Sequence, residues 1–260
     1  MMSHTRSEPV HNMTKFFVDL KFLWLEQMLE LRRTWYWFVV FSCFLPIAMV
    51  FGFTRIGSGL TDASSLIFII SGSAIFAATN EGLYMLAVRI GTMKKEGTLI
   101  YYASLPISKT AFMVAILLSR LIITFPGMIA PLMFGAWLYG VDITLNAWGL
   151  IVILLAALAL ANVGMALGML IDSLELIQII VNILLFILAM AGPIFSPMSA
   201  LPLPLQILSY ALPPSYAAAA LRSTLNGTMD STFFANILVL VVMTIGGFIL
   251  SARTLRWRAG

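Results

Sequence analysis

The sequence predicts an all-α integral membrane protein with six transmembrane helices, and three observations support this. Of its 260 residues, 61% are hydrophobic and only 10% are charged, whereas an ordinary soluble domain carries about 25% charged residues. The mean hydropathy is +1.00. The apolar residues form long continuous runs without the alternation of membrane-barrel strands. A soluble fold of this length cannot bury so much apolar surface, which excludes a soluble enzyme or nucleic-acid-binding protein despite the pI of about 9.4.

Six runs are long enough to cross a bilayer, because a spanning helix needs about 20 predominantly apolar residues. The first run follows charged sequence and lacks the small-residue cleavage site of a signal peptide, so we expect it to be a span. Together the six runs make a transmembrane domain over residues 34–252. The predicted spans are Trp35–Phe53, Leu66–Val88, Phe112–Tyr139, Trp148–Ile171, Leu176–Phe195 and Phe233–Ala252.

The distribution of basic residues predicts the orientation of these spans. Twelve of the 15 Lys and Arg residues fall on one side, whereas Arg55 and Arg222 fall on the other and Arg120 lies inside the third span. Because basic residues concentrate in cytoplasmic loops, we expect both termini in the cytoplasm. The twelve are Arg6, Lys15, Lys21, Arg32, Arg33, Arg89, Lys94, Lys95, Lys109, Arg253, Arg256 and Arg258.

The segment before the first span predicts an amphipathic helix. After a polar tail at residues 1–13, the apolar residues of Thr14–Arg33 recur at steps of three and four. That period places them on one face, so we expect a helix along the cytoplasmic membrane surface. A simple extension of the first span is the alternative. The apolar residues are Phe17, Leu20, Trp24, Met28 and Leu31.

Residues 89–109 form the largest polar connection between two spans. Its middle, Thr98–Leu105, predicts a short helix that ends before Pro106, because proline cannot continue a helix. The connection between the fourth and fifth spans is much shorter and carries Asp172 and Glu175. Six spans with one developed cytoplasmic loop are typical of a transporter or of the membrane part of one.

The last outer connection, residues 196–230, is rich in proline yet largely apolar. Prolines at this density prevent one straight helix, and Leu203–Leu212 is too short to span. We expect a broken or re-entrant pair of short helices, which a bilayer tolerates only where the backbone packs against protein or lines a cavity. A basic tail, residues 253–260, follows the sixth span.

The sequence holds no set of residues suited to catalysis. Gly91 and Gly97 lack both the spacing and the following lysine of a phosphate-binding loop. The one cysteine, Cys43, allows no intrachain disulfide and no cysteine metal cluster, and His4 and His11 lie in the polar tail. We therefore expect neither an enzyme nor a metal or cofactor bound by this chain.

Two ionisable residues fall inside predicted spans, where a charge is costly and indicates function. Glu81 in the second span and Arg120 in the third lie at similar depths from the cytoplasmic side. We hypothesise that they form an ion pair, with simple helix packing or a role in the substrate path as alternatives. Gly164 and Gly168 in the fourth span permit another helix to approach closely.

Polar and aromatic residues recur on one face of the second and fifth spans. Such side chains either bond to a neighbouring helix or line a substrate path, and both remain open. The second-span stripe is Ser73, Phe76, Asn80 and Tyr84, and the fifth-span stripe is Gln178, Asn182, Phe186 and Pro193.

Two sets of motifs follow one another along the chain. The loop motif is Lys95-Glu96-Gly97-Thr98-Leu99, then Leu105-Pro106-Ile107-Ser108-Lys109. The outer motif is Pro197, Leu201-Pro202, Leu205, Leu212-Pro213, Tyr216 and Ala220-Leu221-Arg222. Together they resemble those of ABC type-2 exporter permeases, such as the daunorubicin-resistance and nodulation-factor exporter permeases. Two departures stand out: Ile100 takes the place of a glutamate, and Ala115-Ile116 takes that of a Gly-Lys pair.

The resemblance implies an ATP-driven half-transporter. Two copies, or two related permeases, would form the path, and two separate cytoplasmic ATPase subunits would bind ATP and Mg²⁺. Thr14–Arg33 would be an interface helix, and the loop would contain a coupling helix seated on the ATPase. The first, second and fifth spans would line the substrate path. The implied ATPase-coupling residues are Lys94, Lys95, Glu96, Gly97, Thr98, Leu99, Leu105 and Pro106, and the implied outer gate is Pro193, Pro197, Pro202, Pro213 and Tyr216.

From this resemblance we expect export of a hydrophobic or amphipathic compound, as in multidrug efflux, across a bacterial inner membrane. Its partners would be ATPase subunits, a second permease and membrane lipid, not nucleic acid. Aromatic residues total 12% and are scattered, which favours such a cargo over the alternative, a glycan or lipid-linked polymer. A stand-alone secondary transporter predicts more intramembrane charge and an internal repeat; a membrane anchor for an enzyme complex is a third class.

Overall fold

A computed structural model describes residues 9–32, 35–56, 62–143, 146–191, 194–195 and 202–254. Within these residues every regular element is a helix, which confirms the predicted all-α class. In chain order the elements are α1 (Pro9–Arg32), α2 (Trp35–Ile56), α3 (Ala63–Ala78), the π-helix η1 (Thr79–Met85), α4 (Leu86–Lys95), α5 (Thr98–Ser104), α6 (Lys109–Tyr139), α7 (Ala147–Leu170), α8 (Leu174–Ala191), α9 (Leu203–Tyr210), α10 (Pro213–Leu225) and α11 (Ser231–Thr254).

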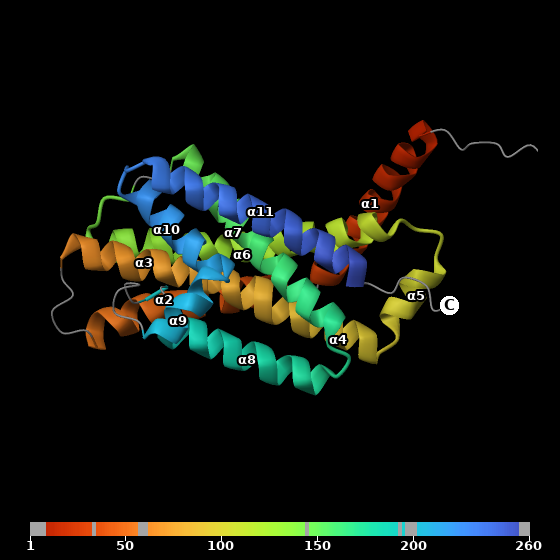
Figure 1. Ribbon diagram of the computed structural model, residues 1–260, viewed down its shortest axis with the longest axis horizontal. Coiled ribbons are helices and arrows are strands. Elements are labelled where there is room, and N and C mark those ends of the chain that lie inside the picture. The colour runs from red at the N-terminus through yellow and green to blue at the C-terminus, as the bar shows by residue number, and fades with distance from the viewer. Residues whose placement is uncertain are drawn as a thin grey trace, which may run out of the picture.

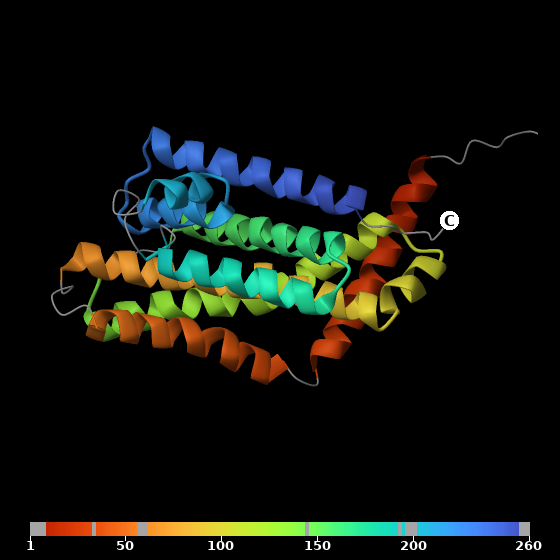
Figure 2. The same cartoon turned by 60° about the horizontal axis from the view of Figure 1, so that its bottom comes forward.

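The long helices lie alongside one another in one bundle, and α1 crosses one end of it obliquely (Figures 1 and 2). The short helix α5 lies at this same end, and α9 and α10 lie toward the opposite end. We refer to the two ends as the α5 end and the α9 end.

Five helical stretches among the described residues are long and apolar enough to cross a membrane. They coincide with five of the six predicted spans. The other predicted span forms α8, whose apolar stretch Leu174–Ala189 is shorter. The sixth crossing therefore stays a prediction. The five stretches are Trp35–Arg55, Ser64–Lys95, Lys109–Tyr139, Ala147–Leu170 and Ser231–Thr254.

The polar segments at the α5 end are more helical than the sequence suggested. The first helix reaches back to Pro9, so part of the tail predicted over residues 1–13 is helical; proline at the first helical position loses no hydrogen bond. Residues 89–95 continue helix α4, so they do not belong to a loop. The short helix predicted within Thr98–Leu105 is confirmed as α5, with Leu105 at its C-cap before Pro106.

The second predicted span lies within one unbroken helical stretch made of α3, η1 and α4. In η1 the backbone hydrogen bonds change from the α-helical pattern to the i→i+5 pattern. At η1 the chain touches α7 backbone to backbone: a Cβ added to Gly82 would lie 2.8 Å from the amide nitrogen of Ala161. On α7, a Cβ on Gly168 would lie 2.7 Å from Cβ of Ile90, and one on Gly164 would collide with the Gly82 carbonyl. The close approach predicted for Gly164 and Gly168 is therefore confirmed.

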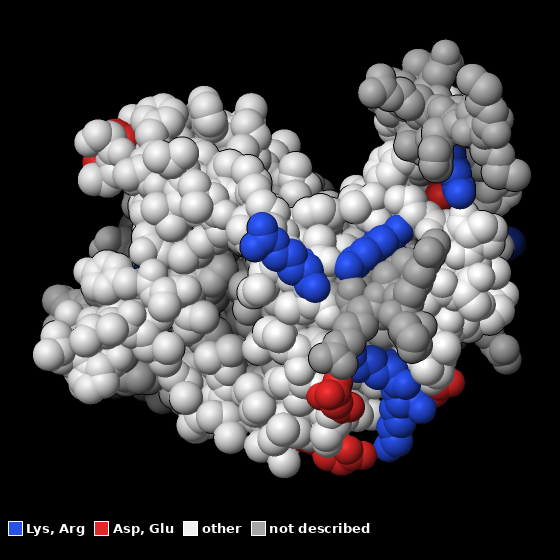
Figure 3. All heavy atoms as spheres, turned by 45° about the vertical axis from the view of Figure 1, so that its right-hand side comes forward, with Lys and Arg blue, Asp and Glu red and all other residues white. Residues whose placement is uncertain are grey.

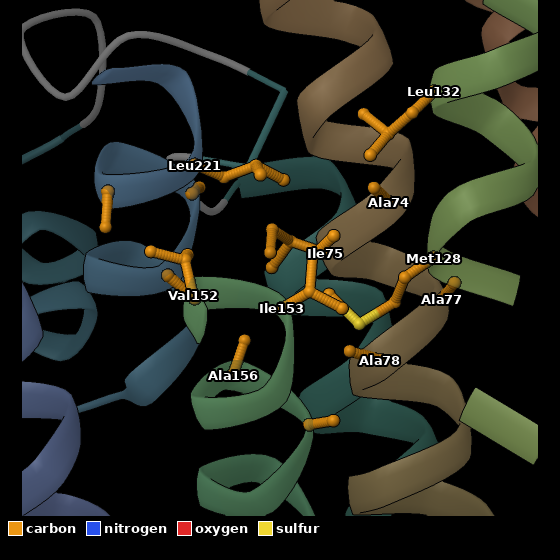
Figure 4. Close-up of a cluster of buried hydrophobic side chains, with 14 of the residues drawn as sticks. Ala74, Ile75, Ala77, Ala78, Met128, Leu132, Val152, Ile153, Ala156 and Leu221 are labelled. Carbon is orange, nitrogen blue, oxygen red and sulfur yellow. The ribbon is translucent and has the colours of Figure 1, made fainter. Parts of the chain in front are cut away.

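The core in the half of the bundle nearer the α9 end mixes alanines with larger side chains (Figure 4). Small side chains on α3 and α7 let these helices approach closely, as in other membrane bundles, and branched side chains and methionine fill the remaining space. Figure 4 shows Ala74, Ile75, Ala77, Ala78, Met128, Leu132, Val152, Ile153, Ala156 and Leu221.

A second core cluster fixes α1 and α5 to the bundle. It joins Leu23 of α1, Ile90 of α4, Tyr102 of α5 and Phe112 of α6. The rings of Tyr102 and Phe112 lie 4.9 Å apart. Because α1 and α5 both bury side chains here, the α5 end is a packed surface and not a flexible loop.

The segment after α8 contains two short helices, α9 and α10. Pro202 occupies the N-cap of α9, and Pro213 is the first residue of α10, positions that suit a residue without an N–H group. The hydroxyl of Tyr216 donates to the backbone oxygen of Tyr210 at 2.8 Å, which ties the two helices together. The re-entrant position of these two helices in a membrane stays a prediction.

Candidate functional site

Helix α5 buries one edge and exposes another that is equally apolar. Leu99 and Tyr102 are 9% and 6% exposed and face the core, whereas Ile100 and Tyr101 are 71% and 60% exposed. At about 100° per residue, Leu99 and Tyr102 lie on one side of the helix axis, and Ile100 and Tyr101 lie on the other. An apolar edge that points away from the protein at a polar end of the bundle is suited to contact another protein.

Acidic residues of α1 hold the segment from α4 to α6 from one side. Tyr102 donates to Oε1 of Glu26 at 2.8 Å, and the backbone N–H of Ser108 donates to Oδ2 of Asp19 at 2.9 Å. Arg89 donates to both carboxylate oxygens of Glu30, at 3.1 Å for Oε1. We call these contacts the α1 clamp.

The α1 clamp changes the acidity of two of its members. The hydrogen bond from Arg89 lowers the pKa of Glu30. Burial, together with the hydrogen bond to Glu26, raises the pKa of Tyr102 well above its usual range. At neutral pH the clamp therefore holds Glu30 as the carboxylate and Tyr102 as the neutral hydrogen-bond donor.

Two lysines hold the same segment from the other side. Lys94 Nζ donates to the backbone oxygens of Met169 and Ile171 at 2.6 and 3.0 Å, and to Oδ1 of Asp172 at 3.2 Å. It thus binds carbonyls at the C-terminal end of α7, where a cation is favoured by the helix dipole. Lys95 Nζ donates to Oε1 of Glu175 at 3.1 Å. We call these contacts the turn clamp.

Figure 3 shows the charged side chains at the α5 end, where blue and red atoms lie together on an otherwise largely uncharged surface. Lys94 is half-buried, and Lys95 and Glu175 are exposed. The charges at this end therefore bind parts of the same chain to one another, in addition to any role toward a partner.

The structure divides the predicted ATPase-coupling residues into groups. Leu99 and Leu105 pack into the second core cluster, and Lys94 and Lys95 belong to the turn clamp. Glu96 and Pro106 are exposed. Gly97 forms the joint between α4 and α5, with a φ of 75° that favours glycine, and Thr98 begins α5.

The exposed pair Ile100 and Tyr101 was missed by the sequence prediction. In the sequence Ile100 is a departure from the family motif, but apolar residues on every side of a seven-residue helix indicate that one edge must face something other than the core.

The two intramembrane charges both lie in the protein interior. Glu81 belongs to η1 and Arg120 to α6, and both are buried. Each charge lies near enough to act on the other electrostatically, but no salt bridge joins the two side chains. Among the described residues, Oε2 of Glu81 has no hydrogen-bond partner. The proposed pairing therefore stays a prediction.

The two polar stripes lie in different surroundings. On the second span, Ser73 and Phe76 are buried inside the protein, so they face no open cavity here. Asn80 and Tyr84 are half-buried. On α8, by contrast, all three described members of the stripe are exposed: Gln178, Asn182 and Phe186.

The α8 stripe contains polar groups that lipid cannot satisfy. Asn182 Nδ2 donates to the backbone oxygen of Gln178 at 2.8 Å, within the helix. An exposed amide on an apolar helix is costly in hydrocarbon, so this face of α8 is suited to a water-filled path or to another protein chain.

The predicted outer gate is described only in part. Pro193 and Pro197 lie outside the described residues. Pro202 is exposed, Pro213 is buried and Tyr216 is half-buried.

Near this region Arg222 of α10 plays a part that the sequence did not reveal. Its Nε donates to Oγ of Ser71 at 3.1 Å, its Nη2 donates to the backbone oxygen of Ile194 at 2.5 Å, and its Cζ lies 3.4 Å from the ring centre of Phe68. A charge within a long apolar region was the one available signal.

Comparison with protein families and with curated proteins gives one match. Residues 18–226 match the family model described as ABC-2 type transporter. No curated protein matches the chain. The matched residues run from α1 through α10 and include both clamps. The chain therefore belongs to the ABC-2 type transporter family, as a multi-pass membrane permease that works with ATP-binding cassette subunits and is not itself the ATPase.

Proposed function

We propose that this chain is the permease subunit of an ATP-driven exporter in a bacterial inner membrane, moving a hydrophobic or amphipathic compound. Two copies, or one copy and a related permease, form the path, and two cytoplasmic ATPase subunits bind ATP and Mg²⁺. The α5 end faces the cytoplasm and both termini lie there. The observation that carries the proposal is the exposed apolar edge of α5, presented on a helix that two clamps hold in place.

Ile100 and Tyr101 form the contact with the ATPase. Burying an isoleucine side chain stabilises a complex by about 1.5–3 kcal/mol, so the double substitution Ile100→Asp, Tyr101→Asp is expected to weaken binding of the co-purifying ATPase subunit at least about tenfold. Titration of that subunit onto the permease in nanodiscs measures the loss.

Helix α9 offers a matched control at the opposite end. Ile207 and Tyr210 are 63% and 58% exposed, so Ile207→Asp, Tyr210→Asp changes the same residue types at similar exposure. This control is expected to keep ATPase binding. Loss of binding in the α9 variant with retention in the α5 variant contradicts the proposed docking surface.

The exposed α8 stripe supports a cargo path along α8, with Asn80 and Tyr84 beside it and Pro202, Pro213 and Tyr216 near its outer mouth. The stripe has two amides and one aromatic ring on an otherwise apolar helix, which suits a largely apolar cargo. We expect ATP-dependent movement of a hydrophobic fluorescent dye in vesicles containing permease and ATPase. Movement of a lipid-linked glycan without movement of the dye supports the polymer alternative instead.

The proposed topology requires α8 to cross the membrane. In a Cys43→Ser background, Ser173→Cys before α8 and Thr228→Cys after α10 are then on opposite sides. A membrane-impermeant maleimide added to intact cells is expected to label position 228 and not position 173. Labelling of both positions, or of neither, means that α8 does not cross.

A further inference from the structure

Helix α8 is attached at both ends by basic side chains that come from other helices. At its start, Lys94 of α4 binds the α7–α8 turn through Met169, Ile171 and Asp172. Beyond its other end, Arg222 of α10 binds the backbone oxygen of Ile194. Between these points one face of α8 is exposed. The polar attachments of α8 therefore lie near its ends, whereas its middle is held by apolar packing of Ile177, Val181 and Leu188.

The attachment at the α5 end is close and polar. Lys94 binds two backbone oxygens at the end of α7 as well as the carboxylate of Asp172, so it fixes the turn backbone and not only a side chain. Nearby, a Cβ added to Gly91 would lie 2.7 Å from Cδ1 of Ile177, so α4 and α8 also touch through apolar atoms. Only Lys95, Glu96 and Gly97 separate Lys94 from α5. The start of α8 is therefore connected to α5 over a short distance.

The attachment at the α9 end involves helices α2, α3 and α10, and not α5. Arg222 joins Ile194 to Ser71 and Phe68 of α3. The next residue, Phe195, stacks on Phe53 of α2 with ring centres 4.6 Å apart. This end is thus held by α2, α3 and α10 together.

We propose that α8 carries the movement of α5 through the bundle, with Lys94 as the positioning residue that moves its start and Arg222 as the fixed point at its far end. The proposal rests on the proposed function, because it takes α5 as the contact with the ATPase. It assigns Lys94 a role toward its own chain, in place of the ATPase contact expected from the sequence. The exposed stripe of Gln178, Asn182 and Phe186 then changes position when α5 moves.

The substitution Lys94→Met tests this, because methionine keeps the length of the side chain and removes its charge. We expect binding of the ATPase subunit to stay within twofold of wild type, while the amount of dye moved per ATP hydrolysed falls at least about tenfold. Lys94→Arg retains the cation and is expected to restore most of this ratio. Arg253→Met, which removes an exposed cation of α11 that belongs to neither clamp, is expected to change the ratio less than twofold.

A second measurement reports α8 directly. A nitroxide attached at Gln178→Cys in the Cys43→Ser background is expected to change its mobility when ATP and Mg²⁺ are added to the permease–ATPase complex. In Lys94→Met the label is expected to stay unchanged while a label at Ile207→Cys on α9 behaves as before. An unchanged transport ratio in Lys94→Met, or a label at position 178 that still responds, overturns the proposal.

Arg222→Lys keeps the test decisive if Lys94→Met does not assemble. Lysine retains the charge but has one nitrogen in place of the separate Nε and Nη2 donors to Ser71 and Ile194, so the label at Gln178→Cys is expected to become more mobile without ATP. If the mobility of the label is the same in Arg222→Lys as in wild type, Arg222 does not fix the far end of α8, and the proposal is overturned. If instead the Ile100→Asp, Tyr101→Asp variant binds the ATPase normally, the proposed function fails, and that result is independent of Lys94.

Discussion

The two ends of the bundle are held together by different kinds of contact. At the α5 end, Arg89 binds Glu30, Lys94 binds Asp172 and Lys95 binds Glu175. At the α9 end, aromatic rings meet: Phe53 stacks on Phe195, and Trp148 of α7 meets Phe233 of α11 edge to face at 5.8 Å. Charged contacts respond to salt and pH, and ring contacts do not. The contacts at the end proposed to bind the ATPase are therefore the ones whose strength changes with salt and pH.

One charged residue at the α9 end departs from this pattern, and it gives the largest expected effect. Arg222→Met leaves the buried oxygens of Ser71 and Ile194 without their donor, which costs about 2–3 kcal/mol. We expect thermal unfolding of the detergent-solubilised protein to shift down by several degrees.

Arg55 provides the control for Arg222, because it also lies over a phenylalanine ring, Phe51, at 5.2 Å, but is exposed. Arg55→Met is expected to cost less than about 0.5 kcal/mol. Equal destabilisation by both substitutions means that the hydrogen bonds of Arg222 add nothing to stability. The α9 end is then held by aromatic and apolar contacts alone.

The α1 clamp gives an intermediate effect. The Arg89–Glu30 pair is partly exposed, with 58% of the Glu30 side chain accessible, so solvent screening limits its contribution to about 0.5–1 kcal/mol. Glu30→Gln is expected to increase hydrogen exchange in α1 a few-fold and to leave α9 and α10 unchanged. Asp142→Asn, an exposed change beyond α6, is the control. Faster exchange at both ends means that the two ends are not independent.

Acid is expected to loosen the α5 end through the same carboxylate. Arg89 lowers the pKa of Glu30 from its usual 4.5. The contact therefore stabilises the folded protein above pH 4.5, and this contribution is lost as the pH falls through the lower folded-state pKa. The protection of α1 amides against hydrogen exchange, relative to the intrinsic rate at each pH, is expected to be lower at pH 4 than at pH 7. Glu30→Gln is expected to abolish the part of the pH dependence due to this residue.

The exposed part of the turn clamp gives the smallest effect. Lys95 and Glu175 have side chains 62% and 68% exposed, and such pairs contribute about 0–1 kcal/mol. Lys95→Met is expected to change the unfolding temperature by no more than about one degree at 0.15 M salt. The same small difference is expected to vanish near 1 M salt, where charges are screened within about 3 Å. A large, salt-independent effect means that Lys95 packs and does not act through its charge.

Five of the predicted spans form helices long and apolar enough to cross a membrane, because a long apolar run leaves few alternatives to such a helix. The sequence also predicted α5, since Pro106 cannot continue a helix and so ends it after Leu105. Gly164 and Gly168 were correctly expected to allow close approach, because a glycine leaves room that a side chain would fill.

The side-chain roles were harder to predict, because they depend on partners far away in the chain. Leu99 and Ile100 are apolar neighbours on α5, and only the packing of the folded protein, in which Leu99 and Tyr102 join the second core cluster, shows which one faces the core. The partner of Lys94 lies in a turn between α7 and α8, and that of Arg222 follows α8. No local pattern reports such pairings, and the i→i+5 hydrogen bonds of η1 leave no mark in the amino-acid order.

The π-helix η1 has a consequence for insertions and deletions. Each residue added to or removed from an α-helix turns everything beyond it by about 100°. A single deletion within Thr79–Met85 could convert η1 to regular α-helix without breaking the chain. Because the wider turns of η1 absorb one extra residue, α4 is expected to keep its orientation after such a deletion, with Arg89 and Lys94 still directed toward Glu30 and Asp172. The removal of one residue is therefore expected to be tolerated better within η1 than within the regular helices α3 and α4 on either side of it.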